Sequence, residues 1–421
     1  MKVFKRSSRS GFALLITLGL LALLVLTVLT LSSLVRISGQ ISSAATYQVQ
    51  ARQNALLGLN VGLSELQRHA GDDTRITGMA GIAGIAPLAA NSTRHWCGVW
   101  ENSGAFVAWL TSGAPNSAVA TPPPAANSIE LVADGSVGAK AADSEHVVAG
   151  KIAITVTEMP NSPGVSATIG SYAYAVLDEG VKIPANAPGS VLGVAPVVFS
   201  TSATSAQGKL RDAIAANTAN LPKTFCYEQL SLLPTPATAL TPSILQDNLH
   251  HTTLTSRFVN GGNLQTGKVN VNTNSAKVWR SVLQTYNLQL AAPVQIASGT
   301  VSSKGTTIQN TIAGSVVSGK AVNGPFTSVA AFSTYLATVF PASGSPTAAQ
   351  IMAVITPMLA VRSDTFRIRG YGDALNPVDP TKIESIANCE AIVQRTTAPA
   401  ANGQGNKFVV LYFRWLGADD I

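Results

Sequence analysis

The sequence predicts an α+β protein in which a long amino-terminal helix, transmembrane in its first half, packs on an antiparallel β-sheet head with an α-helical insertion. Three features predict this fold: an uncharged apolar stretch near the amino terminus, helical spacing of apolar residues beyond it, and strand-like segments on both sides of a helix-rich region. Only 12% of the 421 residues are charged, about half the usual share. This composition argues against an intracellular enzyme with a charged surface.

The amino-terminal stretch is long enough to cross a bilayer. Residues 12–35 are 24 mainly apolar residues, and no charged residue occurs from Ser10 to Val35. A helix of that length rises about 36 Å, which exceeds a hydrocarbon core of about 30 Å. Several basic residues precede the stretch, and only Arg36 follows it closely. We therefore expect a single-pass protein of the inner membrane, with its short amino terminus in the cytoplasm and its head in the periplasm.

The net charge of +7 does not indicate nucleic-acid binding, and nucleic acid is not an expected partner. Four of the positive charges lie before Ser10, and no other part of the chain combines clustered basic residues with aromatic residues. The three cysteines, Cys97, Cys226 and Cys389, lie far apart in the chain and form no CxxC motif, so no zinc or thioredoxin-like motif is indicated. One disulfide among them would leave one free thiol.

The helical pattern continues beyond the apolar stretch. No proline occurs before residue 87, and we predict one helix over about residues 11–69, ended by the Gly-Asp-Asp of residues 71–73. Gly58 and Gly62 lie one turn apart, which favours a close approach of this helix to a sheet. Apolar residues recur along one helical face at Ala51, Ala55, Leu59, Leu63 and Leu66.

Strand patterns flank a helix-rich region. Three antiparallel strands are predicted at residues 363–374, 383–395 and 407–417. Helical patterns precede them at residues 204–216, 225–233, 277–286, 327–340 and 348–359. The predicted parts are a leader (1–11), a transmembrane segment (12–35), an amphipathic continuation of the helix (36–70), a first β-rich part of the head (71–199), an α-rich insertion (200–362) and a second β-rich part (363–421).

Three interpretations of the amino terminus compete: a cleaved secretory signal, a plain membrane anchor and a prepilin-type leader. The apolar region exceeds the roughly 7–15 residues of a secretory signal, although residues 42–44 imitate a small-residue cleavage site. A short basic tail, then Gly11, Phe12 and an apolar stretch without a polar spacer, resembles the class III leaders of type IV pilins and type II secretion pseudopilins. The resemblance implies cleavage by a prepilin peptidase between Gly11 and Phe12, and N-methylation of Phe12.

Ile16 departs from the pilin pattern. It stands at the fifth position after the implied cleavage, where most pilins have Glu. In that family the carboxylate is thought to pair with a neighbouring subunit's terminal amine, and burying either charge alone would be costly. K-type pseudopilins and many PilX-like proteins also lack the acid, and a subunit at a filament tip can do without it. The same absence suits a plain anchor.

Two motifs of the head resemble K-type pseudopilins. The sequence IGSYAYAVLDEGVKIPAN at residues 169–186 resembles a strand and turn that K-type and PilX-like proteins share. The sequence GKVNVNTNSAKVWRSVLQTYN at residues 267–287 resembles an entry to a helix in K-type pseudopilins. In it the side chains of Asn272, Thr273 and Asn274 can accept hydrogen bonds from the first free amides of the helix.

The set of motifs looks most like the Verru_Chthon cassette protein A family. The resemblance extends over nearly the whole chain and implies a pilus-like organisation, in a family without an established biochemical activity. Its motifs here are WCGVWENSGAFVAWL (96–110), the Asp178-Glu179 turn, FRIRGYG (366–372), CEAIVQR (389–395) and FRWLGADDI (413–421).

No cofactor or metal site is predicted. Gly262, Gly267 and Lys268 have the spacing of a phosphate-binding loop, but Val269 stands where a magnesium-binding hydroxyl belongs and the following residues look extended. The pair at residues 250–251, His-His, would face opposite ways on a strand, and no Asp or Glu occurs from residue 248 to 363. The histidine pair is therefore interpreted as part of a solvated loop, and no calcium site is expected.

No catalytic site is predicted either. Asp178 and Glu179 are interpreted as a strand-terminating turn rather than as an acid and base, because Gly180 follows them. His69, His95 and His146 allow a Ser-His-Asp triad, but no serine sits in a G-x-S-x-G elbow. The Asn-Ser-Thr of residues 91–93 matches a glycosylation sequon that carries little meaning by itself.

These patterns predict a non-enzymatic, pilin-like minor subunit of a type IV pilus-like or type II secretion-like assembly, anchored in the inner membrane before assembly. Its expected partners are the lipid bilayer, a prepilin peptidase and other pilin-like subunits, and assembly would bring it toward the cell surface. The alternative is a singly anchored, exported binding or adhesion protein that does not polymerise. An exported enzyme ranks third and would require a pocket that unites a histidine with a carboxylate.

Overall fold

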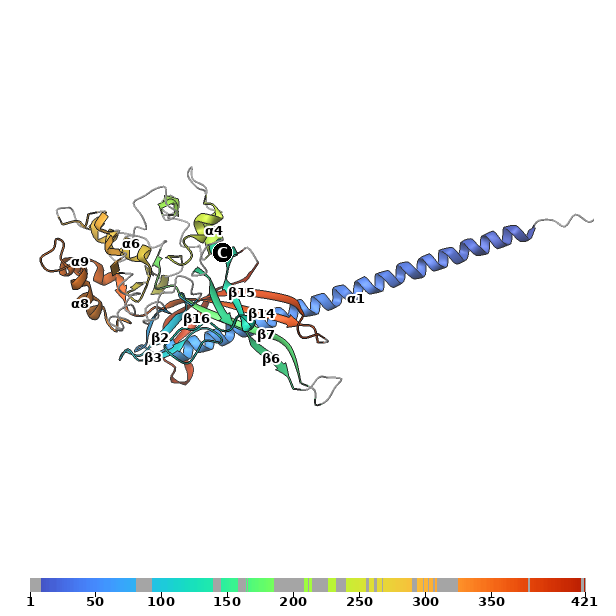
Figure 1. Ribbon diagram of the computed structural model, residues 1–421, viewed down its shortest axis with the longest axis horizontal. Helices are drawn as coiled ribbons and strands as arrows, with labels where there is room; N and C mark the ends of the chain where they lie inside the picture. The colour runs from blue at the N-terminus through green and yellow to red at the C-terminus, as the bar shows by residue number, and fades with distance from the viewer. Residues whose placement is uncertain are drawn as a thin grey trace, which may run out of the picture.

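The computed structural model describes the chain except for residues 1–8, 81–92, 139–144, 158–163, 165, 185–207, 211, 214–225, 232–239, 255–256, 261–262, 267, 290–293, 298, 302, 306, 309–324, 378, 418–419 and 421. Within the described residues a single long helix, α1 (Arg9–Ala70), projects from a head of strands and helices (Figure 1). The exposed part of this helix, residues 12–46, is called the rod. The 62 residues of α1 correspond to about 93 Å. The predicted α+β fold with a long amino-terminal helix is therefore confirmed.

A five-stranded antiparallel sheet forms the centre of the head. Its order is β16-β15-β14-β7-β6. The central strand β14 pairs Ile368 with Val176 of β7 on one side and with Ala391 of β15 on the other. The strands are β6 (Ile152–Val156), β7 (Ala167–Asp178), β14 (Thr365–Leu375), β15 (Ile383–Pro399) and β16 (Asn406–Leu416), so the last three follow the three predicted carboxyl-terminal strands closely.

The second half of α1 packs on one face of this sheet. Ala55 and Leu59 are buried there with Phe366 and Ile368, because alternate residues of β14 point to the helix. The approach is close enough that a Cβ added to Gly58 would lie 2.6 Å from the carbonyl oxygen of Ala173. At Gly62 the same addition would lie 2.9 Å from the ring of Tyr174. The predicted role of these two glycines is confirmed.

Smaller sheets and short helices complete the β-rich part. One three-stranded sheet has the order β1-β2-β3, and β4 pairs with β5. In chain order the elements are β1 (Ile76–Met79), β2 (Cys97–Trp100), β3 (Phe106–Trp109), η2 (Ala125–Asn127), β4 (Ser128–Val132), α2 (Asp134–Val137), β5 (Val147–Gly150) and β8 (Ile183–Pro184).

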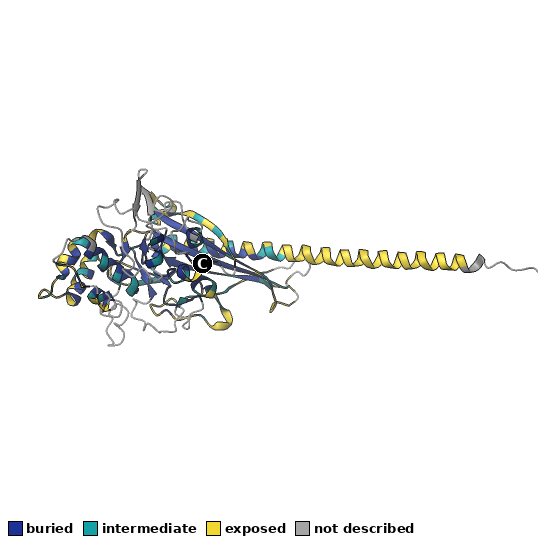
Figure 2. Cartoon of the chain, turned by 90° about the horizontal axis from the view of Figure 1, so that it is seen from above, coloured by how far each residue is buried: buried dark blue, intermediate teal, exposed yellow. Residues whose placement is uncertain are grey.

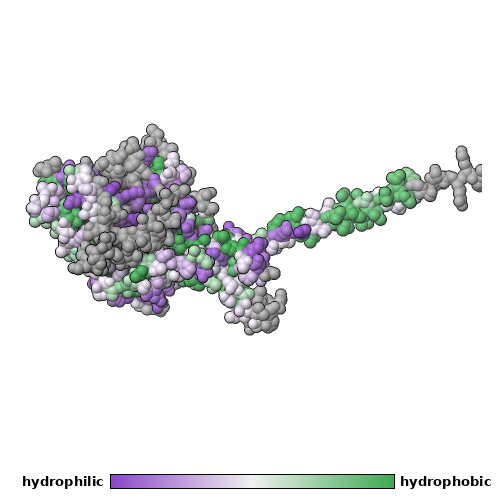
Figure 3. Space-filling model, in the orientation of Figure 1, coloured by the Kyte–Doolittle hydropathy of each residue, from purple (hydrophilic) through white to green (hydrophobic). Residues whose placement is uncertain are grey.

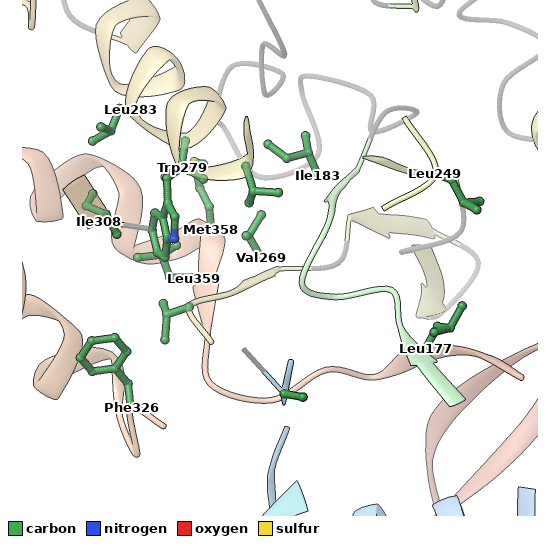
Figure 4. Close-up of a cluster of buried hydrophobic side chains, with 14 of the residues drawn as sticks. Leu177, Ile183, Leu249, Val269, Trp279, Leu283, Ile308, Phe326, Met358 and Leu359 are labelled. Atoms are coloured by element: carbon green, nitrogen blue, oxygen red, sulfur yellow. The ribbon is translucent and has the colours of Figure 1, made fainter. Parts of the chain in front are cut away.

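Of the remaining helices, α6, α8 and α9 lie at the end of the head farthest from the free part of α1 (Figure 1). Trp279 and Leu283 of α6 contribute to a buried apolar cluster with Phe326, Met358 and Leu359 (Figure 4). The elements of the helix-rich part are α4 (Tyr227–Ser231), α5 (Pro242–Gln246), β9 (Thr252–Thr253), β10 (Arg257–Asn260), β11 (Asn263–Thr266), β12 (Val269–Asn270), α6 (Ala276–Gln289), α8 (Val329–Val339), α9 (Ala348–Ile355), η5 (Thr356–Met358) and β13 (Leu359–Ala360). A last 3-10 turn, η6 (Ala401–Gly403), joins β15 to β16.

The predicted capping of α6 is wrong in its residues. The Oγ atom of Ser275 accepts a hydrogen bond from the amide of Val278 at 3.4 Å, so Ser275 occupies the capping position. The Asn272 side chain instead donates to the carbonyl of Phe326 at 3.2 Å and accepts from its amide at 2.8 Å. The Asn-Val-Asn-Thr motif therefore ties together segments that are far apart in the chain, rather than capping a helix.

The three cysteines are free and buried in the structure. Burial raises the pKa of the thiols of Cys97, Cys226 and Cys389, so these groups stay protonated at neutral pH. The disulfide that the sequence left open is absent among these three residues, all of which are described.

Candidate functional site

The first half of α1 presents an exposed apolar surface. Sixteen large apolar side chains between Phe12 and Val35 are exposed, with Phe12 at 72% and Ile16 at 51%. Figure 2 shows this rod as uniformly exposed, and Figure 3 shows its outer part as hydrophobic. Burying each such side chain is worth about 1.5–3 kcal/mol, so leaving all of them in water would cost tens of kcal/mol. This part of the helix requires an apolar environment that the head does not provide.

The polar groups of the rod are satisfied within the helix. The hydroxyl of Thr17 donates to the carbonyl of Leu14 at 2.9 Å, and that of Thr27 donates to Leu24 at 2.8 Å. Such local bonds, together with the helical backbone bonds, leave few polar groups to be hydrated. Among the described helices, α1 is the one that is long and apolar enough to cross a membrane.

The predicted processing residues lie at the start of the rod. Gly11 and Phe12 belong to the first turn of α1, two and three residues after its first residue, Arg9. Residues 1–8 of the predicted leader lie outside the described part. Cleavage after Gly11 and methylation of Phe12 remain predictions.

A short exposed interval separates the apolar surface from the head. Residues 36–46 of α1 are exposed, and partly buried residues begin at Tyr47. Beyond this point side-chain hydrogen bonds hold the helix to the sheet: Asn54 donates to the carbonyl of Asp373 at 2.6 Å, and Gln67 donates to that of Asn406 at 2.9 Å. The rod is thus joined to the head by packing and by hydrogen bonds along the same continuous helix.

A buried network of charged residues lies on the other face of the sheet. Arg367 donates to Glu179 at 3.0 Å and to Glu390 at 2.9 Å. Lys182 donates to Glu179 at 2.6 Å, and Arg369 donates to Glu390 at 2.8 Å. Burial alone would raise the pKa of both carboxyl groups, but the adjacent cations outweigh it and hold each pKa below its usual range.

This charged network is linked to the helix-rich part. Arg414 of β16 bonds Glu390 at 3.1 Å and Glu228 of α4 at 2.8 Å. Because Glu179 is bonded to buried cations of the head, a structural role is the simplest explanation for the Asp178-Glu179 turn. Asp178 is the last residue of β7, so the turn predicted from the sequence does follow a strand. The sequence did not reveal that both carboxylates are buried.

Asp178 differs from its neighbour because no cation pairs with it in the described contacts. Its Oδ1 accepts from the amide of Gly180 at 2.8 Å. Burial nevertheless raises the pKa of the Asp178 carboxyl to about 6, against the lowering effect of hydrogen bonds from Ser363, Gly180 and Thr77. This is a position where a small pH change alters the charge inside the head.

Two histidines and a glutamate form a second polar cluster. The rings of His95 and His250 stack with centroids 3.6 Å apart and an angle of 6° between their planes. Oε2 of Glu145 lies 3.6 Å from Nε2 of His95. One ligand atom from each of the three residues lies within 4.8 Å of the other two. Burial lowers the pKa of both histidines, which keeps their imidazoles neutral.

The interpretation of residues 250–251 as a solvated loop is wrong. His250 is only 4% exposed, and His251 is half-buried with its Nδ1 atom 2.8 Å from Oγ of Ser275. The two neighbours do contact different partners, as their adjacency suggested. Only their spatial partners, His95 and Glu145, reveal the cluster, and these lie more than a hundred residues earlier in the chain.

The other histidines pair with acids. Nε2 of His69 lies 3.0 Å from Glu65, and Nε2 of His146 lies 3.0 Å from Asp134. Each arrangement unites a histidine with a carboxylate, yet none of the hydrogen bonds found for these imidazoles involves a serine. The Ser-His-Asp triad that the sequence allowed but did not predict is therefore not assembled at these two histidines.

The remaining motifs form no site within the described residues. Val269 and Asn270 make strand β12, so the chain after Lys268 is extended, whereas Gly262 and Gly267 lie outside the described part. Asn91 and Ser92 of the sequon also lie outside it. A pocket near the end of α1 has charges of both signs, and is lined by Asp73, Thr74, Arg75, Ile76, Asn102, Lys268, Val329, Leu359, Ala360, Val361, Arg362 and Asp364.

Comparisons with known proteins find a likeness among solved structures. No protein-family model matches the chain, and no curated protein matches it. The chain is similar to a chain in the crystal structure of the GspK-GspI-GspJ complex from the type 2 secretion system of enterotoxigenic Escherichia coli, with a TM-score of 0.29 and 10% sequence identity. The match covers 64% of this chain and 84% of the other.

Proposed function

We propose that this protein is a pilin-like minor subunit of a type IV pilus-like or type II secretion-like assembly, held in the inner membrane by α1 before it assembles. One observation carries the proposal: the exposed apolar half of α1 continues without a break into the helix that packs on the sheet. A cleavable signal would not need this continuity. Such a helix can exchange lipid contacts for contacts with neighbouring helices while its backbone stays internally bonded.

The proposed role is mechanical rather than enzymatic. Among the described residues, the rod has the most extensive exposed apolar surface, because its apolar side chains between Phe12 and Val35 are exposed. The buried charges of the head are bonded mainly to one another, as in the Arg367 to Glu179 and Glu390 contacts. These observations support a subunit that assembles through its rod and presents its head.

Processing can be tested with a matched pair of glycine substitutions. Gly11→Val alters the proposed cleavage site, whereas Gly19→Val places the same side chain in an open position of the same helix, with nothing within 4 Å of the added Cβ. Mass spectrometry of protein isolated from native membranes should find a methylated Phe12 terminus for the unmodified chain and for Gly19→Val, and an intact leader for Gly11→Val. An intact leader on all three would contradict the processing step.

Assembly requires a separate measurement. A single cysteine at Leu24, which is 57% exposed on the rod, should form cross-links to other subunits with apolar amino-terminal helices after oxidation in native membranes. A cysteine at Val119, exposed on the head, is the matched control and should not give the same products.

The competing candidate is a singly anchored binding protein that does not polymerise. Ile16 favours it, since the rod carries no acid for a neighbour's terminal amine. An uncleaved terminus together with absent rod cross-links would support this candidate and contradict the proposed assembly.

A further inference from the structure

His95, Glu145 and His250 come from three separate parts of the chain. His95 ends a turn just before β2, Glu145 lies two residues before β5, and His250 lies between α5 and β9. His95 and His250 are 5% and 4% exposed, and the Glu145 side chain is 26% exposed. The cluster is therefore buried on the imidazole side and reaches solvent on the carboxylate side.

The imidazole of His95 lacks the partners that a buried polar side chain normally has. Neither Nδ1 nor Nε2 of His95 has a hydrogen-bond partner, and Oε2 of Glu145 is slightly too distant at 3.6 Å from Nε2. Buried polar groups are almost always satisfied, because desolvation without a bond is costly. An unsatisfied, fully buried imidazole beside a carboxylate and a second imidazole is an arrangement that a bound cation would complete.

We propose that these three side chains bind one divalent transition-metal ion of the zinc class. Two imidazole nitrogens and one carboxylate oxygen are a ligand set that zinc accepts, whereas calcium requires six to eight oxygen ligands. Around a tetrahedral zinc ion with bonds of about 2.0–2.2 Å, the ligand atoms lie about 3.4 Å apart. The 3.6 Å between His95 and Glu145 nearly matches this spacing, and the whole set lies within 4.8 Å. The two rings stack in parallel here, so metal binding requires at least one of them to turn until both ring planes pass through the ion.

The surrounding backbone holds the ligands in place. Trp96, next to His95, donates from its indole nitrogen to the carbonyl of Val148 in β5 at 2.9 Å. The carbonyl of His251, next to His250, accepts from the amide of Ile183 in β8 at 2.9 Å. Nε2 of His250 lies 2.7 Å from the carbonyl oxygen of Glu145, which fixes this ring through one nitrogen and leaves Nδ1 as the other candidate donor to the metal.

A metal at this position would clamp the helix-rich part to the β-rich part. The three ligands span 155 residues of the chain, so one ion would close two long loops of the chain at a single point. Glu145, being partly exposed, provides the access route for the ion and for a water molecule as its fourth ligand. The inferred role is structural and does not depend on the rod or on assembly.

The test uses the full chain in detergent, produced without a polyhistidine tag and freed of metal by a chelator. Zn²⁺ is titrated in competition with a chromogenic chelator. The unmodified chain should bind one Zn²⁺, and His95→Gln, Glu145→Gln and His250→Gln should each weaken binding by about 100-fold or more. The matched control is His146→Gln, since His146 follows Glu145 directly but pairs with Asp134. Its Zn²⁺ affinity should equal that of the unmodified chain.

A second measurement, on the unmodified chain, tests the proposed metal site if the variants fail to fold. The Co²⁺-loaded protein should show the intense visible bands of a tetrahedral site, without a sulfur charge-transfer band. Absence of stoichiometric Zn²⁺ binding, sulfur ligation, or unchanged affinity in folded ligand variants would overturn the proposal.

Discussion

Arg367 of β14 and Glu390 of β15 form an ion pair in which Nη1 and Oε1 are 2.9 Å apart and both side chains are completely buried. The two residues do not face each other directly in the register, in which Arg367 is opposite Ile392 and Glu390 is opposite Arg369. Arg367 therefore reaches along the sheet to a carboxylate that Arg369 and Arg414 also contact. One carboxylate thus holds three cations from two neighbouring strands.

Removing one member of this buried pair should be strongly destabilising. Arg367→Met removes one buried cation from both Glu179 and Glu390, and breaking a buried pair in this way typically costs about 3–5 kcal/mol. Arg75→Met is the matched control, because Arg75 pairs with the largely exposed Glu101, and it should cost less than about 1 kcal/mol. Denaturant unfolding of both variants in detergent measures the difference. Equal losses would refute a special role for the buried pair.

The contact between α1 and the sheet gives a second prediction. Gly58→Ala places a Cβ 2.6 Å from the carbonyl oxygen of Ala173, and overpacking of this kind costs about 1–3 kcal/mol. Gly39→Ala introduces the same methyl group into the same helix with nothing within 4 Å, and should cause no loss. Thermal unfolding of the head, followed by near-UV circular dichroism, compares the two. A stable Gly58→Ala variant would show that α1 is held less closely than described.

The raised pKa of Asp178 predicts a specific pH dependence of the free energy of unfolding. Its pKa is raised from 3.8 to about 6, so between these values the folded state holds a proton that the unfolded state has lost. The contribution of Asp178 to stability is therefore fully present below about pH 4 and is lost as the pH rises through about 6, by an amount on the order of 3 kcal/mol. The unfolding free energy of the unmodified chain, relative to Asp178→Asn, should fall by that amount between pH 4 and 7. A difference that stays flat or rises would contradict the raised pKa.

Local sequence patterns predicted the long helix and the carboxyl-terminal strands well. The spacing of Ala51, Ala55 and Leu59 is a property of adjacent turns, and the glycines at 58 and 62 lie where that face meets β7 and β14. The carboxyl-terminal strands were equally visible, because alternation of Phe366 and Ile368 needs only neighbouring residues. Both signals are local, because they depend only on residues within a few helical turns or within one strand.

The polar interior could not be predicted, because it depends on which distant segments meet. Arg367 and Arg369 alternate with apolar residues and so look like the solvent face of a half-buried strand. In the structure that face is covered, and Arg369 donates to the carbonyl of Leu131 in β4 at 3.0 Å. His250 was misjudged for the same reason, since no Asp or Glu occurs from residue 248 to 363 and the carboxylate of its cluster belongs to Glu145.

The unbroken course of α1 determines how force passes through the protein. Between the apolar half and the sheet lie residues 36–46, about 16 Å of exposed helix that contains no proline. The rod and the head are therefore joined by continuous helix rather than by a loop. A pull or a torque applied to the exposed end of α1 would pass along the helix to the strands that pack on its other end, and turning the exposed end would turn the outward-facing side of the head with it.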